Sequence, residues 1–95
     1  MRVISRKAIL EFIKQHPDAG SALQHWFHVV KHAKWTSLTD VRQIYPHADL
    51  VDRRTVFNIA GNRYRLIARI NYRAQVVYIL HILTHSEYDR ERWKR

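Results

Sequence analysis

The chain has 95 residues with a formal net charge of +9, from 17 lysines and arginines against 8 acidic residues, and it has no cysteine. A hydrophobic content of 46% excludes a disordered chain, and the absence of cysteine excludes a disulfide framework, a thiolate nucleophile and a cysteine-ligated zinc site. The positive charge favours nucleic acid or an anionic membrane surface as the partner.

No segment is suited to crossing a membrane or to secretion. The longest apolar stretches are too short to span a bilayer, and residues 1–4 lack the apolar core of a signal peptide. We therefore expect a cytoplasmic protein without a membrane partner, with residues 1–95 forming a single domain.

The N-terminal half predicts a short strand followed by a helix. Residues 2–4 are expected to join an edge of the sheet. Ser5 then suits the N-cap of a first helix, which carries an apolar stripe and stops before Pro17.

Two more helices are expected before the sheet. The second begins near residue 18 and ends at residue 34 or 35, because its apolar residues recur at three- and four-residue steps. Ser37 followed by Asp40 resembles a capping box for a short third helix, which Pro46 stops. A polar stretch, residues 47–54, then leads into the sheet.

The C-terminal half predicts a three-stranded antiparallel meander. Residues 55–60 are β-branched and aromatic, and the Gly-Asn step at residues 61–62 suits a two-residue hairpin turn with positive φ angles. That turn pairs Asn58 with Arg65 in the next strand. Residues 76–84 are a nearly unbroken apolar run, which predicts an inner strand covered on both faces.

The middle strand alternates between apolar and basic residues. Its predicted core face comprises Tyr64, Leu66, Ala68, Ile70 and Tyr72, and its opposite face comprises Arg63, Arg65, Ile67, Arg69, Asn71 and Arg73. We expect the four arginines to line an open face and bind phosphate, because they have almost no acidic neighbour and a guanidinium suits phosphate. A merely solvated strand face is the alternative.

The register of the last strand decides which face carries two histidines. A three-residue turn at residues 73–75 pairs Arg65 with Leu83 and brings His81 and His85 to the arginine face. A two-residue turn buries both histidines. We favour the first register, because buried histidines need hydrogen-bonding partners that the sequence does not offer.

His28 and His32 have the i, i+4 spacing of a metal-binding pair on the second helix. No Asp, Glu or Cys lies on that helix face to provide a third ligand. We therefore interpret the pair as solvated, and we expect neither a metal nor a cofactor.

The segment Thr-His-Ser-Glu-Tyr-Asp at residues 84–89 lies where the last strand meets a terminal helix, which we expect over about residues 86–93. A purely structural interpretation makes Ser86 the N-cap, with the two acids favoured by the dipole of the first turn. That interpretation leaves His85 and the hydroxyl of Tyr88 unexplained. Both are therefore candidates for proton transfer.

Residues 56–59, 61–67 and 84–89, with Trp35 upstream, together resemble the HigB-type toxins of bacterial toxin–antitoxin pairs, within the RelE superfamily. The elements Gly-Asn-x-x-Arg and Thr-His-x-x-Tyr-Asp carry the resemblance in combination. It is consistent with the α+β layer that the predicted order of elements indicates. The fold implied is a RelE-like small domain, with N-terminal helices on one face of a twisted, mainly antiparallel sheet and a short C-terminal helix.

The resemblance also implies a function. Such a toxin is a metal-independent endonuclease that cleaves mRNA on the ribosome, until a cognate HigA-like helix-turn-helix antitoxin neutralises it. The 2′-hydroxyl of the RNA attacks the adjacent phosphate and leaves a 2′,3′-cyclic phosphate and a 5′-hydroxyl.

The candidate residues fit that chemistry. Arg65 can neutralise the charge of the phosphorane, His85 can transfer a proton, and Tyr88 can orient or protonate the leaving group or stack on a base. The expected RNA-binding residues are Asn58, Arg63, Arg69 and Arg73. Asn58 matches a family position, as do the three catalytic candidates. Arg69 and Arg73 rest on the arginine pattern alone.

Two other functions stay open on the sequence. A non-catalytic RNA-binding or ribosome-binding module could use the same arginines. A gyrase-directed toxin of the related ParE type would alter DNA supercoiling and leave RNA intact.

Overall fold

The apolar residues that recur at three- and four-residue steps form the expected helices. The computed structural model describes residues 1–94. Its N-terminal half contains α1 (Arg6–Gln15), the 3₁₀ turn η1 (Pro17–Ala19), α2 (Gly20–His32) and α3 (Leu38–Ile44). The three predicted helices are confirmed, with η1 in place of the first turn expected of the second helix. Within residues 1–94, no helix is long and apolar enough to cross a membrane.

The capping box predicted for α3 does not form. Ser37 occupies the N-cap position, but its side chain makes no capping hydrogen bond. Asp40 instead accepts hydrogen bonds from the backbone and the hydroxyl of Thr36, at 2.8 and 2.7 Å. Its carboxylate therefore holds the residue before the N-cap.

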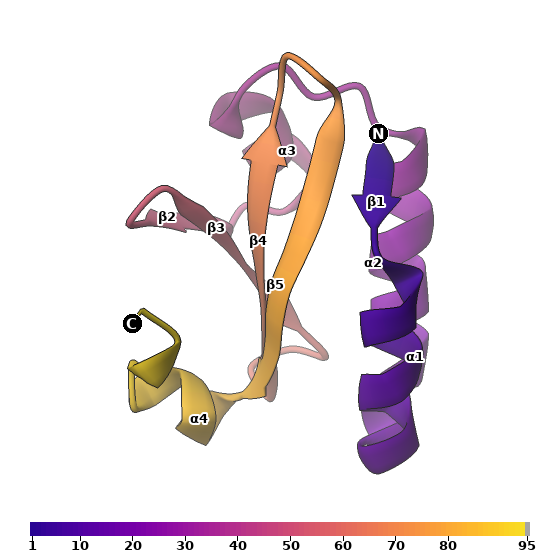
Figure 1. The fold of residues 1–95 in the computed structure, drawn as a ribbon, viewed down its shortest axis with the longest axis vertical. Helices are drawn as coiled ribbons and strands as arrows, with labels where there is room; N and C mark the ends of the chain where they lie inside the picture. The colour runs from indigo at the N-terminus through magenta and orange to yellow at the C-terminus, as the bar shows by residue number, and fades with distance from the viewer. Residues whose placement is uncertain (95) are drawn as a thin grey trace.

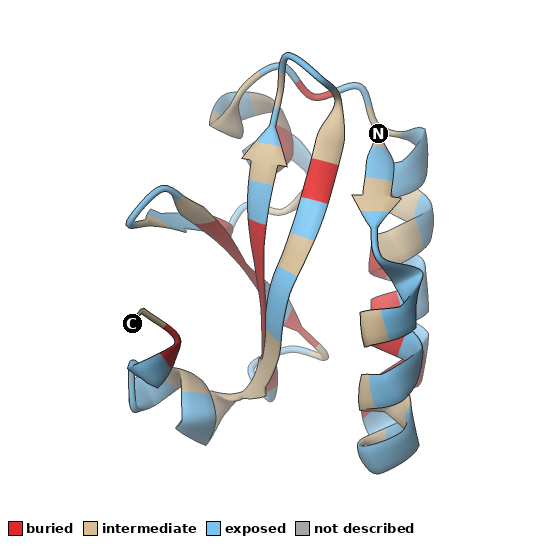
Figure 2. Cartoon of the chain, in the orientation of Figure 1, coloured by how far each residue is buried: buried red, intermediate tan, exposed pale blue. Residues whose placement is uncertain are grey.

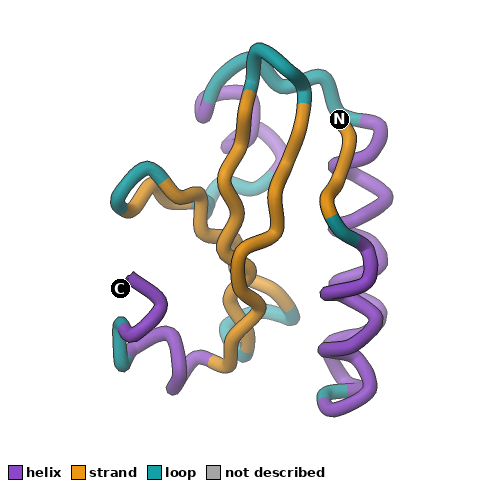
Figure 3. Tube along the Cα trace, in the orientation of Figure 1, coloured by secondary structure: helices purple, strands orange, loops and turns teal. Residues whose placement is uncertain are grey.

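Five strands form one mixed sheet in the order β1-β5-β4-β3-β2 (Figure 1). They are β1 (Arg2–Ile4), β2 (Asp49–Val51), β3 (Arg54–Ile59), β4 (Tyr64–Asn71) and β5 (Val76–Thr84). The predicted antiparallel meander is confirmed, and β1 joins it parallel to β5. The three residues of β2 were missed, because a strand so short within a polar stretch has no visible alternation (Figure 3).

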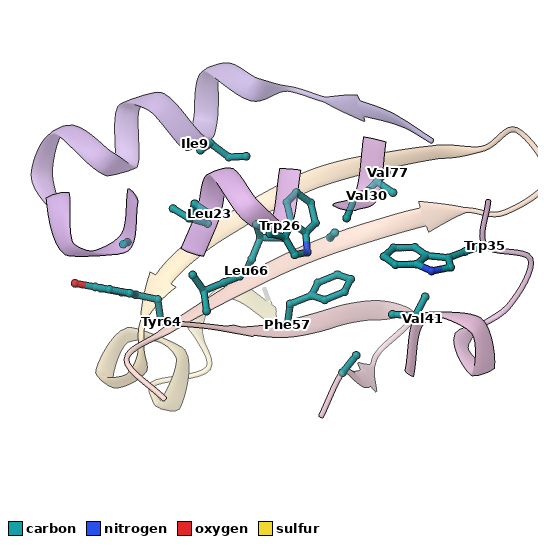
Figure 4. Close-up of a cluster of buried hydrophobic side chains, with 14 residues drawn as sticks. Ile9, Leu23, Trp26, Val30, Trp35, Val41, Phe57, Tyr64, Leu66 and Val77 are labelled. Atoms are coloured by element: carbon teal, nitrogen blue, oxygen red, sulfur yellow. The ribbon is translucent and has the colours of Figure 1, made fainter. Parts of the chain in front are cut away.

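The main hydrophobic core lies between the sheet and the helices α1, α2 and α3 (Figure 4). Trp26 of α2 is fully buried and meets the ring of Phe57 in β3 edge to face, with 5.4 Å between the ring centres. The predicted core side of β4 is confirmed, since Leu66 and Ala68 are fully buried. The opposite face of the sheet is the arginine-bearing side of β4.

The turn between β3 and β4 has the predicted register but a different conformation. It spans residues 60–63 and is closed by a backbone hydrogen bond of 3.4 Å. The positive φ angles belong to Ala60 (53°) and Gly61 (68°), so the expectation of positive φ at Asn62 is wrong. Asn62 instead accepts a hydrogen bond from the side chain of Arg65.

A β-bulge in β5 combines the two registers considered for the second hairpin. Near the turn, Asn71 pairs with Val76, which is the register of the two-residue turn. Leu80 then has no partner on β4, and beyond it Arg65 pairs with Leu83, as the three-residue turn predicted. The predicted partner of Arg65 is therefore right, although the turn proposed to explain it is wrong.

The prediction that β5 is covered on both faces is also wrong (Figure 2). β1 pairs with only its first three residues. Val77 is the one buried residue of the strand, whereas Tyr78 and Leu80 are more than a third exposed. Among the described residues, no strand pairs with the C-terminal half of β5 on its β1 side. The apolar composition of residues 76–84 did not reveal this exposure.

Candidate functional site

The strand β5 leads directly into the short helix α4 (His85–Asp89), which begins with a complete capping box. Thr84 Oγ1 accepts a hydrogen bond from the Glu87 N–H at 3.1 Å, and Glu87 Oε1 accepts one from the Thr84 N–H at 2.9 Å. The predicted N-cap at Ser86 is therefore wrong. The Thr-x-x-Glu spacing in the sequence was the signal that could have identified the true cap.

The single terminal helix expected over residues 86–93 is divided in two. After α4, the chain turns into the 3₁₀ segment η2 (Arg92–Lys94). The turn returns Trp93 to the sheet, where it is buried with Val56 and Ile67 in a second, smaller hydrophobic cluster. The C-terminal segment thus lies on the face of the sheet opposite the helical core.

This segment covers part of the arginine face that the sequence predicted to be open. The ring of Tyr88 stacks on Trp93, with ring centres 5.1 Å apart and an angle of 14° between the planes. The Trp93 indole N–H donates a hydrogen bond of 3.0 Å to the Tyr88 carbonyl. Arg65 lies under Tyr88 and is only 8% exposed. The expectation of a solvent-facing Arg65 is therefore wrong.

Arg65 is fixed by its neighbours in the turn and by α4. Its Nη1 donates hydrogen bonds to the carbonyls of Tyr64 at 3.0 Å and Asn62 at 3.3 Å, and its Nη2 donates to Asn62 Oδ1 at 2.6 Å. The guanidinium carbon lies 5.6 Å from the centre of the Tyr88 ring, within cation–π range. Across the hairpin, Asn58 is its confirmed partner on β3.

The charge of Arg65 has no acidic counterpart. Among residues 1–94, no Asp or Glu oxygen lies within 4.0 Å of its guanidinium. A buried cation that is hydrogen-bonded only to neutral oxygens keeps its full charge available to an incoming anion. The site is therefore electrostatically prepared for a negatively charged group.

His85 connects the start of α4 to the turn that leads into β4. Its backbone N–H donates a hydrogen bond of 2.9 Å to the Arg63 carbonyl. Its Nδ1 lies 2.9 Å from Asp89 Oδ2, one helical turn further on. A carboxylate in this position favours a proton on Nδ1 and leaves Nε2 as the nitrogen that can exchange a proton with a ligand.

The hydroxyl of Tyr88 is held in its protonated form. Burial raises the pKa of Tyr88 above its ordinary value, and the negative charge of Asp49 adds to this effect. The positive charges of Arg65 and Lys94 oppose it without reversing it. At neutral pH, Tyr88 can therefore donate a hydrogen bond.

The other predicted arginines do not join this cluster. Arg63 forms an ion pair of 3.0 Å with Asp18, which also accepts a 2.6 Å hydrogen bond from the Tyr64 hydroxyl. The exposed Arg69 lies opposite Tyr78 on β5. Arg73 lies in the turn between β4 and β5, at the end of the sheet away from α4 (Figure 1).

The structure therefore groups Asn58, Arg65, His85 and Tyr88 at one end of the sheet. Sequence reasoning missed three residues that support this group, namely Asn62, Asp89 and Trp93. The i, i+4 spacing of His85 and Asp89 was a usable signal for one of them. The rings of the other candidate pair, His28 and His32, are 4.7 Å apart, and no cluster of three possible metal ligands occurs among the described residues.

Comparisons with known proteins agree with the resemblance noted in the sequence. Residues 19–91 match the profile of the HigB_toxin family, described as the RelE-like toxic component of a toxin-antitoxin system. The "mRNA interferase HigB" of Escherichia coli O6:H1 (strain CFT073) is 29% identical over 93 residues, which are 95% of this chain and 90% of that protein. The "mRNA interferase toxin HigB" of Escherichia coli K12 is 26% identical over 92 residues, 94% of this chain and 88% of that protein.

Proposed function

The chain belongs to the HigB family of RelE-like toxins, and on this premise we propose that it is an mRNA interferase, an endoribonuclease that cleaves translated mRNA on the ribosome. Membership in a family of toxin–antitoxin components implies an antitoxin partner. We further propose that this partner is a HigA-like helix-turn-helix protein and that the reaction needs no metal.

The observation that carries the proposal is the uncompensated charge of Arg65. Arg65 is 8% exposed as a whole residue, its guanidinium is fixed by three hydrogen bonds to neutral oxygens, and no carboxylate lies within 4.0 Å of it in the described part of the chain. Cleavage through a phosphorane develops negative charge on the phosphate oxygens. A preorganised cation stabilises that charge without reorganising, and electrostatic stabilisation of this kind is commonly the largest single contribution to catalysis.

Two proton transfers complete the reaction. The 2′-oxygen attacks the adjacent phosphorus and loses its proton to Nε2 of His85, whose Nδ1 is held by Asp89. The bond from phosphorus to the 5′-oxygen then breaks, and this oxygen takes up a proton. The Tyr88 hydroxyl, kept protonated by its raised pKa, is the proposed donor. The products are a 2′,3′-cyclic phosphate and a 5′-hydroxyl.

The flanking RNA has further contacts in this scheme. Asn58 lies opposite Arg65 and can donate hydrogen bonds to the bound strand. Arg63, Arg69 and Arg73 are spread along β4 and its two turns, and we propose that they bind phosphates away from the cleaved bond. The ion pair between Arg63 and Asp18 is exposed to solvent, so an RNA phosphate can still reach the Arg63 guanidinium.

Primer extension on an mRNA in a translating extract tests the proposal. The wild-type protein is compared with Arg65→Ala and His85→Ala, and with the matched controls Lys14→Ala and His25→Ala, which alter exposed residues on α1 and α2. Discrete cuts that require translation, are lost in both site variants and persist in both controls are the expected result.

Intact mRNA with the wild-type protein would overturn the proposed nuclease activity. Co-sedimentation with ribosomes would then favour the binding-module alternative, and altered plasmid supercoiling would favour a gyrase-directed toxin. Cuts that persist without translation would keep the nuclease and remove the ribosome from the proposal.

A further inference from the structure

A groove of about 320 Å³ lies beside the Arg65 cluster and contains none of the residues proposed for the reaction. Its lining residues are His81, Leu83, Glu87, Arg90, Arg92 and Trp93. We call it the His81 groove. Leu83, which lines the groove, is the cross-strand partner of Arg65, so the groove adjoins the proposed site of cleavage. Its size falls near the lower end of the range for small-ligand sites.

The bulge at Leu80 decides that His81 lies on the face of the sheet that bears the groove. In the register found near the turn, His81 would lie opposite Leu66 and face the helical core. The bulge shifts the pairing by one residue, so that His81 lies opposite Ile67, on the face that α4 covers. Bulges frequently occur beside functional sites, where they redirect a side chain. The core itself gains nothing from this one, because Leu80 is 37% exposed.

The side chains of the groove suit one nucleotide of a single-stranded RNA. Arg90 and Arg92 are exposed, and neither forms an ion pair with any Asp or Glu among residues 1–94. Glu87 Oε1 is engaged by the capping box of α4. The indole N–H of Trp93 is also occupied, so this ring offers an apolar wall.

The surroundings of His81 determine the protonation state of its imidazole. Burial lowers the pKa of His81, and the positive charge of Arg54 lowers it further. Glu87, Arg90 and Arg92 line the groove with His81, and Glu11 of α1 lines a second hollow with it on the helical side. At neutral pH the imidazole is therefore uncharged, with one nitrogen that donates and one that accepts hydrogen bonds. An uncharged imidazole suits the edge of a base better than a phosphate.

We propose that the His81 groove is a nucleotide subsite, in which Arg90 and Arg92 bind the phosphate of a nucleotide next to the cleaved bond and His81 hydrogen-bonds to its base. This inference rests on the proposed function, because it takes single-stranded mRNA as the ligand. In it, His81 is a residue that positions the RNA and selects its base, whereas His85 exchanges the proton.

The phosphate contact is tested with an RNA that cannot be cut. A fluorescent 2′-O-methyl oligoribonucleotide lacks the nucleophile, and its affinity is measured by anisotropy over a series of salt concentrations. The double variant Arg90→Gln, Arg92→Gln is compared with Lys14→Gln, Lys34→Gln, which removes the same charge from the helical side. We expect the slope of log affinity against log salt to fall by about 0.7 in the groove variant alone.

The base contact is tested by moving an abasic nucleotide along the same RNA. With the wild-type protein, we expect one position to weaken binding by about three- to tenfold, as the loss of one hydrogen bond would. In His81→Asn, that penalty should disappear, whereas His25→Asn should retain it. This is a double-mutant cycle, so a general loss of folding cannot imitate the result.

Equal salt slopes in the two double variants would overturn the phosphate contact, and an unchanged abasic profile in His81→Asn would overturn the base contact. No binding of RNA by the wild-type protein at any salt concentration would overturn both. The outcome is separable from that of the proposed function. If the groove variants alter RNA binding as expected but the wild-type protein does not cleave mRNA, only the nuclease is rejected. If the wild-type protein cleaves mRNA but the groove variants bind RNA as the wild type does, only the subsite is rejected.

Discussion

The guanidinium of Arg65 lies 5.6 Å from the centre of the Tyr88 ring, so the cation on β4 and the aromatic residue on α4 hold each other in place. Neither residue is positioned by its own element alone. The turn and the first residue of β4 supply the hydrogen-bond acceptors, on Asn62 and Tyr64, and α4 covers the other side of the guanidinium with Tyr88. Removing either side should therefore disturb the other.

Arg65→Lys separates charge from geometry. Lysine keeps the positive charge but cannot reproduce the fork that donates to Asn62 and Tyr64. We expect mRNA cleavage to fall by about 100-fold and the free energy of unfolding by about 1 to 3 kcal/mol. Single-turnover cleavage and urea denaturation measure these two effects. The exposed Arg53→Lys is the control, and full activity of Arg65→Lys would contradict the proposed role.

Tyr88→Phe isolates the hydroxyl. The phenyl ring can still stack on Trp93 and contact Arg65, so we expect the free energy of unfolding to change by no more than about 0.5 kcal/mol. Cleavage should nevertheless fall by about 100-fold if the hydroxyl supplies the proton. Parallel measurements of thermal unfolding and cleavage decide this, and an active Tyr88→Phe would leave the ring as the only functional part.

Asp89→Asn tests how His85 is oriented. Asparagine removes the carboxylate that favours a proton on Nδ1, and its amide can present a donor instead. We expect cleavage to fall by about tenfold, which is less than the loss in His85→Ala, with the affinity for RNA unchanged. Titration with 2′-O-methyl RNA and single-turnover kinetics separate binding from turnover. A loss confined to affinity would reject the orienting role.

Asp18→Asn should change the pH dependence of stability. The hydrogen bond from Tyr64, together with Arg63, lowers the pKa of Asp18 below its usual 3.8. The stabilisation is therefore complete above the unfolded-state pKa and is lost as pH falls through the lower folded-state pKa. Urea denaturation should find the variant less stable than the wild type at neutral pH, with the difference vanishing as pH falls through the lowered pKa of folded Asp18. A pH-independent difference would contradict this linkage.

Deleting Leu80 should be tolerated, although it lies in the middle of a strand. Without it, the ladder becomes regular, and His81 and Leu83 keep their partners on β4. We expect the free energy of unfolding to change by about 1 kcal/mol or less. The matched deletion of Val77 moves Tyr78 into a fully buried position and should unfold the protein. Circular dichroism with urea denaturation compares the two variants. An equal loss of unfolding free energy in both would contradict the prediction that Leu80 is an extra residue in β5.

The sequence predicted most of the secondary structure because its signals are local. The alternation around Leu66 and Ala68 identified the core face of β4, and the Gly-Asn step identified the register that pairs Asn58 with Arg65. The burial of Arg65 could not be predicted in the same way. Arg65 lies against Tyr88, whose ring stacks on Trp93, and Trp93 reaches the sheet because α4 ends at Asp89 and the chain turns into η2.

Four of the seven predicted site residues, Asn58, Arg65, His85 and Tyr88, lie together in the structure, and their roles stay a prediction. Tyr88 lies against Arg65, as the combination of motifs suggested, and His85 begins the helix beside them. The arginine row failed as a continuous surface, since Arg63 turns to Asp18 and Arg73 lies at the far end of the sheet. A period of two gives the face of a strand but does not reveal which segment later covers it.

The two hydrophobic clusters imply that loss of activity and loss of structure are separate events. Among residues 1–94, fourteen buried residues form the main core, whereas the C-terminal segment is held to the sheet by a cluster with three buried members, Val56, Ile67 and Trp93. Such a segment can open at a lower free energy than the whole fold. Mild heat or denaturant should therefore abolish the proposed mRNA cleavage while the helices α1 to α3 and the sheet stay folded. Amide hydrogens of residues 85–94 should exchange before those of β4.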